Sequence, residues 1–442
     1  MKNQTLAAVA AVCILISGCG REIKQNKNSS LPVTTLSDES SIAEEYFDDS
    51  SAYEPAEESS ADESSEEESE PDSSSEEEKE PVLEGGGSFE VYEKVRIKDL
   101  VTDTNTKLSD PDELIDTDTP GEHTAKIKYT LDGKKGEAEL SYSVADTTPP
   151  VIFADGSGTT VGVGEPFLLD NVISYGDNYD REPYASYDGF VDTSAEGSYP
   201  ITVYISDSSG NTLSYSMNVA VTSGGSSTGT NYDRIPFDSF IAQYGGEGRS
   251  LGIDVSAWQG SIDFDQVRDA GCEFVIARAG HCGSDHTLGQ DSYFYSNIDG
   301  ARAAGLKVGV YFYSADNSEE EVREHARWLA GLLDGRELDF PVAFDWESFY
   351  RFQQYGMSLH DLNRLYDAFE EELTAAGYET MLYGSKNFLI NAWEDTDTRT
   401  VWLAHYVNET NYEGEYLLWQ RCGWGRINGI NGDVDLDVLF RG

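Results

Sequence analysis

The last 210 or so residues alternate short apolar runs with amphipathic runs, and this alternation limits the possible folds more than any other feature. The apolar runs that read as strands cover residues 252–256, 274–278, 307–313, 341–345, 379–383, 401–404, 416–420 and 433–437. The helical runs cover residues 264–270, 293–304, 318–333, 359–376 and 386–392. Alternating strands and helices predict a parallel sheet, and eight strands can close into a barrel. Because the last three strands leave no room for helices between them, we expect an irregular (β/α) barrel of the TIM type with about five helices.

The fourth predicted strand ends in two carboxylates, Asp345 and Glu347. Residues i and i+2 of a strand point to the same side, so these two acids should project together while Trp346 points away. Two adjacent acids repel each other, which predicts that the pKa of one rises and that of the other falls. Such a pair suits the cleavage of a glycosidic bond. A solvated Asp-x-Glu at a strand end is the alternative that the motif alone leaves open.

Other chemically useful side chains are expected near the same end of the barrel, where the strands of such folds carry their active sites. Asp254 lies in the first predicted strand, and Asp435 lies in the eighth, which closure places beside the first. Four carboxylates should therefore face one another. The candidates for binding sugar rings are Tyr311, Tyr313, Tyr383, Trp402, Tyr406, Trp419 and the amide of Gln420. Aromatic faces suit the apolar faces of sugars, although core packing would account for roughly half of these rings.

Five motifs in this order resemble the glycoside hydrolase family 25 lysozymes. They are Asp254-Val-Ser-x-Trp-Gln259, Phe344-Asp-Trp-Glu347, Trp402-Leu-Ala-x-Tyr406, Leu418-Trp-Gln420 and Val434-Asp-Leu-Asp437. The resemblance covers about residues 249–442. It implies N-acetylmuramidase activity, which hydrolyses the β-1,4 bond from N-acetylmuramic acid to N-acetylglucosamine in peptidoglycan glycan strands.

The resemblance also implies roles for single residues. The acid of the family maps onto Glu347, its stabilising carboxylate onto Asp345, and its two supporting acids onto Asp254 and Asp435. On the third strand, where the family often has Tyr-His-Phe, this chain has Tyr311-Phe-Tyr313, so any role of that histidine is absent.

Several alternatives stay open at this point. The spacing of the two acids fits a retaining, an inverting or a substrate-assisted course. Two rival functions are a non-catalytic barrel that binds the cell wall and a hydrolase of another N-acetylated glycan.

The middle of the chain has a different sequence pattern, in which short runs of alternating apolar and polar residues are separated by turn residues. This pattern predicts two small antiparallel β modules, at residues 88–147 and 148–222, that repeat with a period of about 76 residues. The Asp146-Thr-Thr-Pro-Pro joint and the Asp207-x-x-Gly-Asn turn make them resemble bacterial immunoglobulin-like surface modules. They are a stiff spacer or a wall-binding unit. A linker at residues 223–245 and a catalytic domain at residues 246–442 should follow.

The N-terminus reads as a secretory signal, with Lys2 followed by a short apolar stretch. Its end, Leu15-Ile-Ser-Gly-Cys19, resembles a bacterial lipobox, which implies cleavage before Cys19 and attachment of lipid to its sulfur. Residues 20–87 then form a predicted disordered, acidic tether. The expected location is the outer face of the bacterial cytoplasmic membrane, with contact to the membrane only through the lipid.

Composition excludes some partners and cofactors. A formal net charge of −52 argues against nucleic acid as a partner. The chain has five cysteines but neither a Cys-x-x-Cys nor a His-Glu-x-x-His pattern, so we predict no metal and no cofactor. A disulfide between Cys282 and Cys422 is left open, because it requires Cα atoms within about 7 Å. A monomer is expected.

Overall fold

The computed structural model describes residues 79–154, 160–223, 233–350 and 352–440. The predicted signal, Cys19 and nearly all of the predicted tether lie outside the described residues. Within the described part, no helix is both long enough and apolar enough to cross a membrane.

The first β module consists of two small sheets. Its elements are β1 (Leu83–Gly85), β2 (Ser88–Glu90), α1 (Ile97–Leu100), β3 (Val101–Thr104), β4 (Lys107–Leu108), β5 (Gly121–Leu131) and β6 (Lys134–Ala145). One sheet has the order β2-β6-β5-β4, and the other pairs β1 with β3. The β5–β6 hairpin turns at Asp132 and Gly133, both at positive φ, as a two-residue hairpin turn requires. Because β1 pairs with β3, the ordered chain begins before the predicted module boundary at residue 88.

The second β module repeats this plan. Its elements are β7 (Val151–Ala154), β8 (Thr160–Gly162), η1 (Leu169–Asn171), β9 (Ser174–Gly176), β10 (Tyr184–Gly189), β11 (Gly197–Ser206) and β12 (Thr212–Thr222). One sheet has the order β10-β11-β12-β8, and the other pairs β7 with β9. Alternate residues of β11, such as Val203 and Ile205, are fully buried, which confirms the period-two pattern seen in the sequence.

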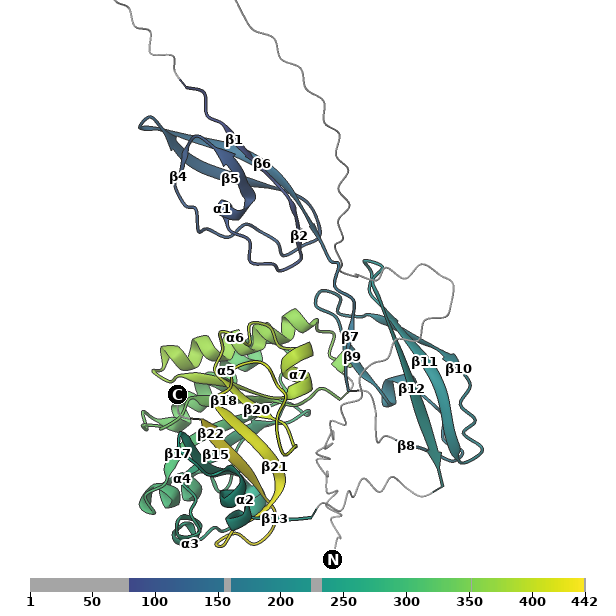
Figure 1. Cartoon of the computed structure of the whole chain (residues 1–442), viewed down its shortest axis with the longest axis vertical. Helices are drawn as coiled ribbons and strands as arrows, with labels where there is room; N and C mark the ends of the chain where they lie inside the picture. The colour runs from purple at the N-terminus through teal and green to yellow at the C-terminus, as the bar shows by residue number, and fades with distance from the viewer. Residues whose placement is uncertain (1–78, 155–159, 224–232, 351, 441–442) are drawn as a thin grey trace, which may run out of the picture. The chain divides into compact units, whose positions relative to one another are not determined.

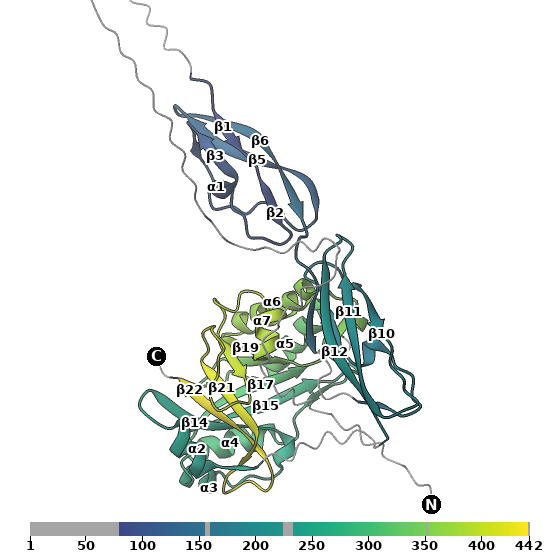
Figure 2. The same cartoon turned by 45° about the vertical axis from the view of Figure 1, so that its right-hand side comes forward.

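The C-terminal domain is built on a sheet that closes on itself (Figures 1 and 2). The closed sheet runs in the order β14-β15-β17-β18-β19-β20-β21-β22 and back to β14. Its strands are β14 (Arg249–Val255), β15 (Phe274–Cys282), β17 (Lys307–Ser314), β18 (Val342–Trp346), β19 (Thr380–Ser385), β20 (Val401–Ala404), β21 (Leu418–Arg426) and β22 (Val434–Phe440). Each of the eight predicted strands overlaps one of these strands over most or all of its length.

Five helices lie between the first six strands of the closed sheet, as expected. They are α3 (Phe264–Asp269), α4 (Phe294–Ala303), α5 (Glu319–Leu333), α6 (Leu359–Ala375) and α7 (Lys386–Asn391). The short elements η2 (Ala257–Gln259), β16 (Leu288–Gln290) and η3 (Phe352–Gln354) lie in the intervening loops. Ser318 caps α5 by accepting a hydrogen bond from the backbone N–H of Glu321, and three glutamates occupy the first turn, where the helix dipole favours them.

One strand differs from the predicted all-parallel sheet. β22 runs antiparallel to both of its neighbours, β14 and β21. Only a short connection separates β21 from β22, and a parallel crossover needs a dozen or more residues, so the pair must form a hairpin. As a result, the beginning of β22 lies at the same end of the sheet as the carboxyl ends of the other strands.

The predicted linker at residues 223–245 is shorter than expected. Its last part forms β13 (Ile235–Pro236), which pairs with β21, and α2 (Phe237–Tyr244). Phe237, Phe240 and Tyr244 are buried in the core of the C-terminal domain, which explains why this segment is ordered.

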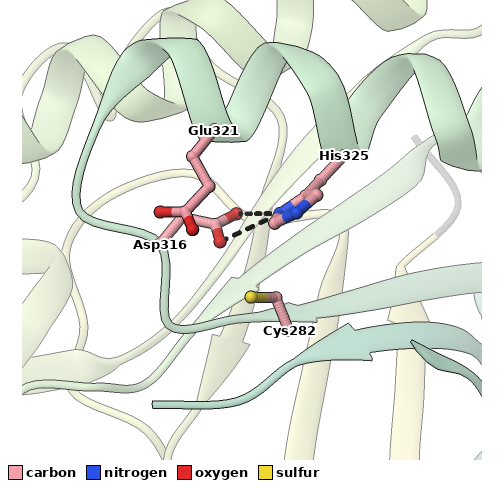
Figure 3. A group of neighbouring side chains, drawn as sticks. All are labelled: Cys282, Asp316, Glu321 and His325. Atoms are coloured by element: carbon pink, nitrogen blue, oxygen red, sulfur yellow. Dashed lines mark hydrogen bonds and ion pairs between the residues drawn. The ribbon is translucent and has the colours of Figure 1, made fainter. Parts of the chain in front are cut away.

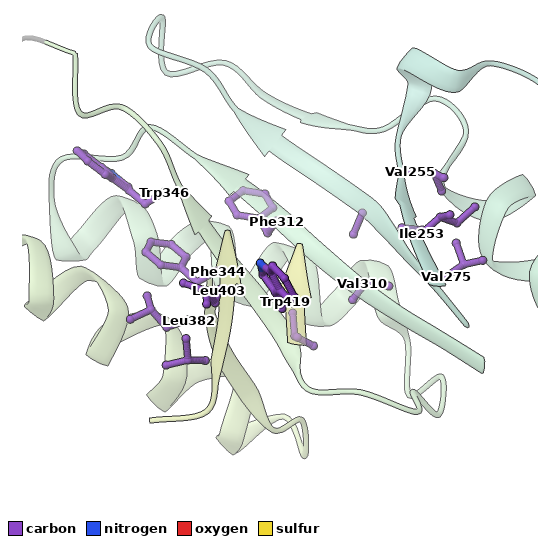
Figure 4. Close-up of a cluster of buried hydrophobic side chains, with 14 of the residues drawn as sticks. Ile253, Val255, Val275, Val310, Phe312, Phe344, Trp346, Leu382, Leu403 and Trp419 are labelled. Carbon is purple, nitrogen blue, oxygen red and sulfur yellow. The ribbon is translucent and has the colours of Figure 1, made fainter. Parts of the chain in front are cut away.

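Alternation along the strands divides the buried residues into two groups. Figure 4 shows part of the outer group, which includes Ile253, Phe344, Trp346 and Trp419 and packs under the helices. The inner group fills the closed sheet and includes Ile276, Ala343, Met381, Trp402 and Leu418. Residues on the inner side near the carboxyl ends of the strands are therefore the ones that can form a site.

Candidate active site

The paired acids lie where the sequence predicted. Asp345 is the last but one residue of β18, and Glu347 follows the strand directly. Ala343 belongs to the inner group and Phe344 and Trp346 to the outer one, so Asp345 and Glu347 have the inward parity. The indole N–H of Trp346 donates to the backbone carbonyl of Asp316 at 2.9 Å, which holds this ring on the opposite side of the strand.

Two more acids face this pair from the seam of the closed sheet. Asp254 of β14 and Asp435 of β22 are direct partners in the antiparallel register. The neighbouring residues Ile253 and Leu436 both belong to the outer group, so the two acids have the inward parity. The antiparallel direction of β22 is what brings Asp435, near the start of its strand, level with Asp254. The structure thus brings together all four predicted acids.

An amide at the centre of the site connects one acid with two hydroxyls. Gln420 of β21 donates from Nε2 to Asp254 Oδ2 at 2.8 Å. Its Oε1 accepts from the hydroxyls of Tyr383 at 2.9 Å and Tyr406 at 2.7 Å. The two phenols therefore fix which way the amide faces, and the amide in turn holds Asp254 in place.

Asp437 is a fifth acid that the sequence reasoning did not select. It is fully buried two residues beyond Asp435, on the same face of β22. Its Oδ1 accepts from the indole N–H of Trp402 at 2.9 Å. The signal was present in the Val434-Asp-Leu-Asp437 motif, whose two acids share one side of a strand.

Burial dominates the electrostatics of the acids. It raises the pKa of Glu347 to about 7, against the effect of the Tyr383 hydroxyl, which lowers it. Burial, with the charges of Glu347 and Asp254, also raises the pKa of Asp345 well above its usual range. The prediction that one pKa rises and the other falls is therefore wrong. Both pKa values rise, because removal from water is the largest effect on each carboxyl.

The other acids follow the same rule. Burial and the charge of Asp437 raise the pKa of Asp254, while burial and the charge of Asp254 raise that of Asp435. Burial and the charge of Asp435 raise the pKa of Asp437. Each of these nearby carboxyls therefore makes ionisation of its neighbours less favourable, and their titrations are coupled.

A cation lies beside the acids on β15. Arg278 is half-buried and forms an ion pair with the buried Asp291 at 2.8 Å. The guanidinium lowers the pKa of Asp345 against the larger effect of burial. Arg278 thus favours the ionised form of Asp345 without neutralising it in a direct ion pair.

The predicted sugar-binding rings divide into different environments. Tyr311, Tyr383 and Tyr406 pack with the inner group near the acids. Tyr313, on the same strand as Tyr311, is half-buried and has the same parity. These four tyrosines therefore share the inward parity of the acids.

The two tryptophans are placed differently. Trp402 is only 1% exposed, and its indole N–H donates to Asp437 instead of lying at the protein surface. Trp419 belongs to the outer group, where its N–H donates to the carbonyl of His405 at 2.8 Å. Its parity is opposite to that of Gln420, so it does not join the acids. Trp258 of η2, by contrast, is 74% exposed just beyond the end of β14.

The three cysteines in the described residues are free thiols, which answers the open question about Cys282 and Cys422. Figure 3 shows Cys282 beside Asp316, Glu321 and His325. His325 Nδ1 lies 3.0 Å from both carboxylate oxygens of Asp316. Glu321 in turn pairs with the ring of His286 at 2.8 Å. Both carboxylates of this group therefore have partners, which indicates a structural network.

Comparison with known proteins identifies the domain that carries the acids. Residues 253–430 match the family described as Glycosyl hydrolases family 25. This range contains Asp254, Asp345 and Glu347, whereas Asp435 and Asp437 lie just beyond it.

Two curated relatives match the same part of the chain. An autolytic lysozyme of Clostridium acetobutylicum is 32% identical over 197 residues, which are 43% of this chain and 56% of that protein. Lysozyme M1 of Streptomyces globisporus is 27% identical over 197 residues, which are 42% of this chain and 65% of that protein. The chain thus spans between half and two thirds of the length of each.

Among solved structures, the bacterial lysozyme from Streptomyces coelicolor is 24% identical, with a TM-score of 0.36; the match covers 44% of this chain and 92% of that one. The similarity to glycosyl hydrolase family 25 and to these lysozymes thus lies in the part of the chain that carries Asp254, Asp345 and Glu347.

Proposed function

We propose that the C-terminal domain is a peptidoglycan hydrolase of the N-acetylmuramidase type. The observation that carries the proposal is the pair Asp345 and Glu347 at the end of β18, inside a region that matches family 25 and is similar to two curated proteins named lysozymes. Glycosidic cleavage requires one carboxyl that can donate a proton and a second that can stabilise positive charge. A non-catalytic wall-binding barrel would not need five buried or half-buried acids in one place.

Glu347 is the proposed general acid. Its pKa of about 7 keeps the proton on the carboxyl at mildly acidic pH. The proton passes to the glycosidic oxygen as the bond from that oxygen to the sugar C1 breaks. Water then adds to the sugar, and a proton returns to Glu347.

Asp345 is the proposed stabilising carboxylate. As the C1–oxygen bond breaks, the sugar ring gains positive charge, which an adjacent carboxylate stabilises in a site shielded from water. Arg278 already favours the ionised form of Asp345, and the charge on the ring would favour it further. The same two acids can serve a retaining, an inverting or a substrate-assisted course.

Asp254 and Asp435 are proposed as supporting acids, and Asp437 joins them. The Gln420 amide and the Trp402 indole hold Asp254 and Asp437 by direct hydrogen bonds. The proposed contacts to sugar are Tyr311, Tyr313, Tyr383, Tyr406 and Gln420. The outward parity of Trp419 and the hydrogen bond from Trp402 to Asp437 support a packing role for those two rings instead.

We further propose that the enzyme works on the cell wall from a lipid anchor at Cys19, through the acidic tether and the two immunoglobulin-like modules as a spacer. The support comes from the lipobox-like sequence and the composition of residues 20–87. Because all five acids come from one closed sheet, a monomer is sufficient for activity.

A substrate comparison tests the proposed function. The purified chain is incubated with peptidoglycan sacculi and, in parallel, with chitin, and soluble fragments are measured. The proposal expects release from sacculi and none from chitin. Release from chitin alone would assign the domain to another N-acetylated glycan, and binding to sacculi without release would favour the wall-binding alternative.

A further inference from the structure

A second group of acids lies far from the family 25 motifs, at the joint of the two β modules. Asp146 directly follows β6, Asp177 follows β9 and Asp207 follows β11. One carboxylate oxygen from each lies within 4.8 Å of the others. The three residues are only 6%, 0% and 9% exposed, so three acids are removed from water together.

Three oxygen atoms of this group have no partner. In the described part of the chain, both carboxylate oxygens of Asp146 and Oδ2 of Asp177 are buried without a hydrogen bond. The adjacent Asn178 also has a buried, unpartnered Oδ1. A buried charge without compensation costs several kcal/mol, so the arrangement lacks a positive partner.

The local turns hold the acids in this arrangement. Oδ1 of Asp177 accepts from the backbone N–H groups of Tyr179 at 2.9 Å and Asp180 at 2.7 Å, which leaves its Oδ2 free for the group. Oδ1 of Asp207 accepts from the N–H groups of Gly210 at 2.7 Å and Asn211 at 2.8 Å. The carboxylates are therefore positioned by the backbone before any ligand arrives.

Both modules contribute to the position of Asp146. Asn211 donates from Nδ2 to the carbonyl of Asp146 at 3.1 Å and to Oδ2 of Asp207 at 2.9 Å. On the other side, the carboxylate of Glu90 in β2 accepts from the backbone N–H groups of Thr147 at 3.0 Å and Thr148 at 3.2 Å. The residue that links the modules is thus fixed from both directions.

Removal from water affects two of the three acids strongly. Burial raises the pKa of Asp177 to about 6, and the charges of Asp146 and Asp207 contribute. Burial also raises the pKa of Asp146, whereas Ser209 and the amide of Thr148 lower it without meeting the geometry of a hydrogen bond.

We propose that Asp146, Asp177 and Asp207 bind a calcium ion at the joint of the two modules. Oxygens that surround one cation at about 2.4 Å can be at most about 4.8 Å apart, which matches the observed grouping. Ligands that are all oxygen exclude the nitrogen and sulfur preference of zinc. Calcium takes six to eight oxygens in flexible geometry, whereas magnesium demands a tighter octahedron.

The ion would lock the two modules together. Its ligands come from the end of the last strand of the first module and from two turns of the second. Because the site exists only in the folded chain, binding stabilises the joint by mass action. The group in Figure 3 lacks this property, since its carboxylates already have partners.

Calcium titration of the whole chain tests the proposal. The chain is freed of metal with a chelator and titrated calorimetrically with calcium chloride to about 10 mM, well above the affinities typical of extracellular calcium modules. Asp146→Asn and Asp177→Asn are compared with Asp188→Asn, an exposed aspartate of β10 in the same module. The acidic residues before the modules bind cations weakly in every variant, so the difference between variants isolates the joint.

The expected result is one saturable calcium event in the parent chain and in Asp188→Asn that is lost in the other two variants. Magnesium chloride at the same concentration should not displace it. No saturable event in the parent chain, or an unchanged one in Asp177→Asn, would overturn the proposal.

Thermal unfolding without calcium separates a metal site from a merely structural role. If Asp177 is a ligand, Asp177→Asn removes an uncompensated charge, so the metal-free variant should unfold at a higher temperature than the metal-free parent. It should also lose the calcium-dependent rise seen in the parent. A variant that unfolds at a lower temperature and still responds to calcium would contradict the proposal, whatever the enzymatic activity.

Discussion

The two acid clusters of this protein solve the same electrostatic problem in different ways. The carboxyls inside the closed sheet lie among an amide, two phenols, an indole and a guanidinium, and burial raises their pKa values. The carboxyls at the joint are oriented by backbone N–H groups and keep oxygens without partners. The first arrangement suits proton transfer, and the second suits a cation.

The difference teaches that an acidic cluster is defined by its donors rather than by its charge. Gln420 and Trp402 donate hydrogen bonds to the acids from neutral groups. They do not take up the protons that the acids could pass to a substrate. Backbone amides at the joint fix one oxygen of Asp177 and leave the other free. Substitutions should therefore affect one cluster without the other.

The largest effect is expected from Glu347→Gln. It removes the proton donor, and general acid catalysis typically contributes about 10²- to 10⁴-fold in rate. Turnover of solubilised peptidoglycan should fall by that factor, while calcium binding at the joint stays at the parent level. The matched control is Glu379→Gln, an exposed glutamate just before β19 that should keep parent activity. Near-normal turnover of Glu347→Gln would break the assignment.

Asp345→Asn should have the next largest effect. It keeps the shape of the side chain but removes the negative charge that stabilises the sugar cation, which corresponds to a loss of about 10²- to 10³-fold in kcat. The measurement is kcat and KM on the same substrate. A change confined to KM would mean that Asp345 only binds the sugar.

The pH dependence should reveal the raised pKa of Glu347. Because the acid must carry its proton, kcat/KM should fall about tenfold per pH unit above a break near 7. The Tyr383 hydroxyl lowers this pKa, so Tyr383→Phe should move the break to higher pH. A break at the ordinary pKa of an exposed glutamate would contradict the burial of the acid.

A smaller effect, on stability, is expected from Trp402→Phe. The change leaves Asp437 without its indole donor in a fully buried place, at a cost of about 1–3 kcal/mol in the free energy of unfolding. Denaturant unfolding measures this cost. Trp258→Phe, on an exposed ring, should stay within about 0.5 kcal/mol of the parent.

Much of the acid cluster inside the closed sheet could be predicted because it follows from strand alternation and closure. Asp345 and Glu347 share a side of one strand, and the pairing of the first and last strands brings Asp254 to Asp435. Asp437 was not selected from the sequence, and Trp419 was expected to contact sugar although it points outward. The same alternation along the strands determines the orientation of both residues. The antiparallel direction of β22 could also have been predicted, because the connection between β21 and β22 is too short for a parallel crossover.

The joint cluster could not be predicted from spacing. Its acids lie about 30 residues apart along the chain, and Asp177 and Asp207 are each ordinary turn aspartates that accept from backbone amides. Only the packing of the two modules brings them within ion-binding distance. The absence of a metal motif in the sequence therefore did not exclude a metal site.

The identity of the new reducing end after digestion tests the central claim most directly. Purified peptidoglycan is digested with the parent chain, the products are reduced with borohydride, and the terminal sugar alcohol is identified by mass spectrometry. Cleavage by the acids of β18 as proposed predicts N-acetylmuramitol, which disappears in Glu347→Gln and persists in Glu379→Gln. N-acetylglucosaminitol instead, or no new reducing end at all, would contradict the account.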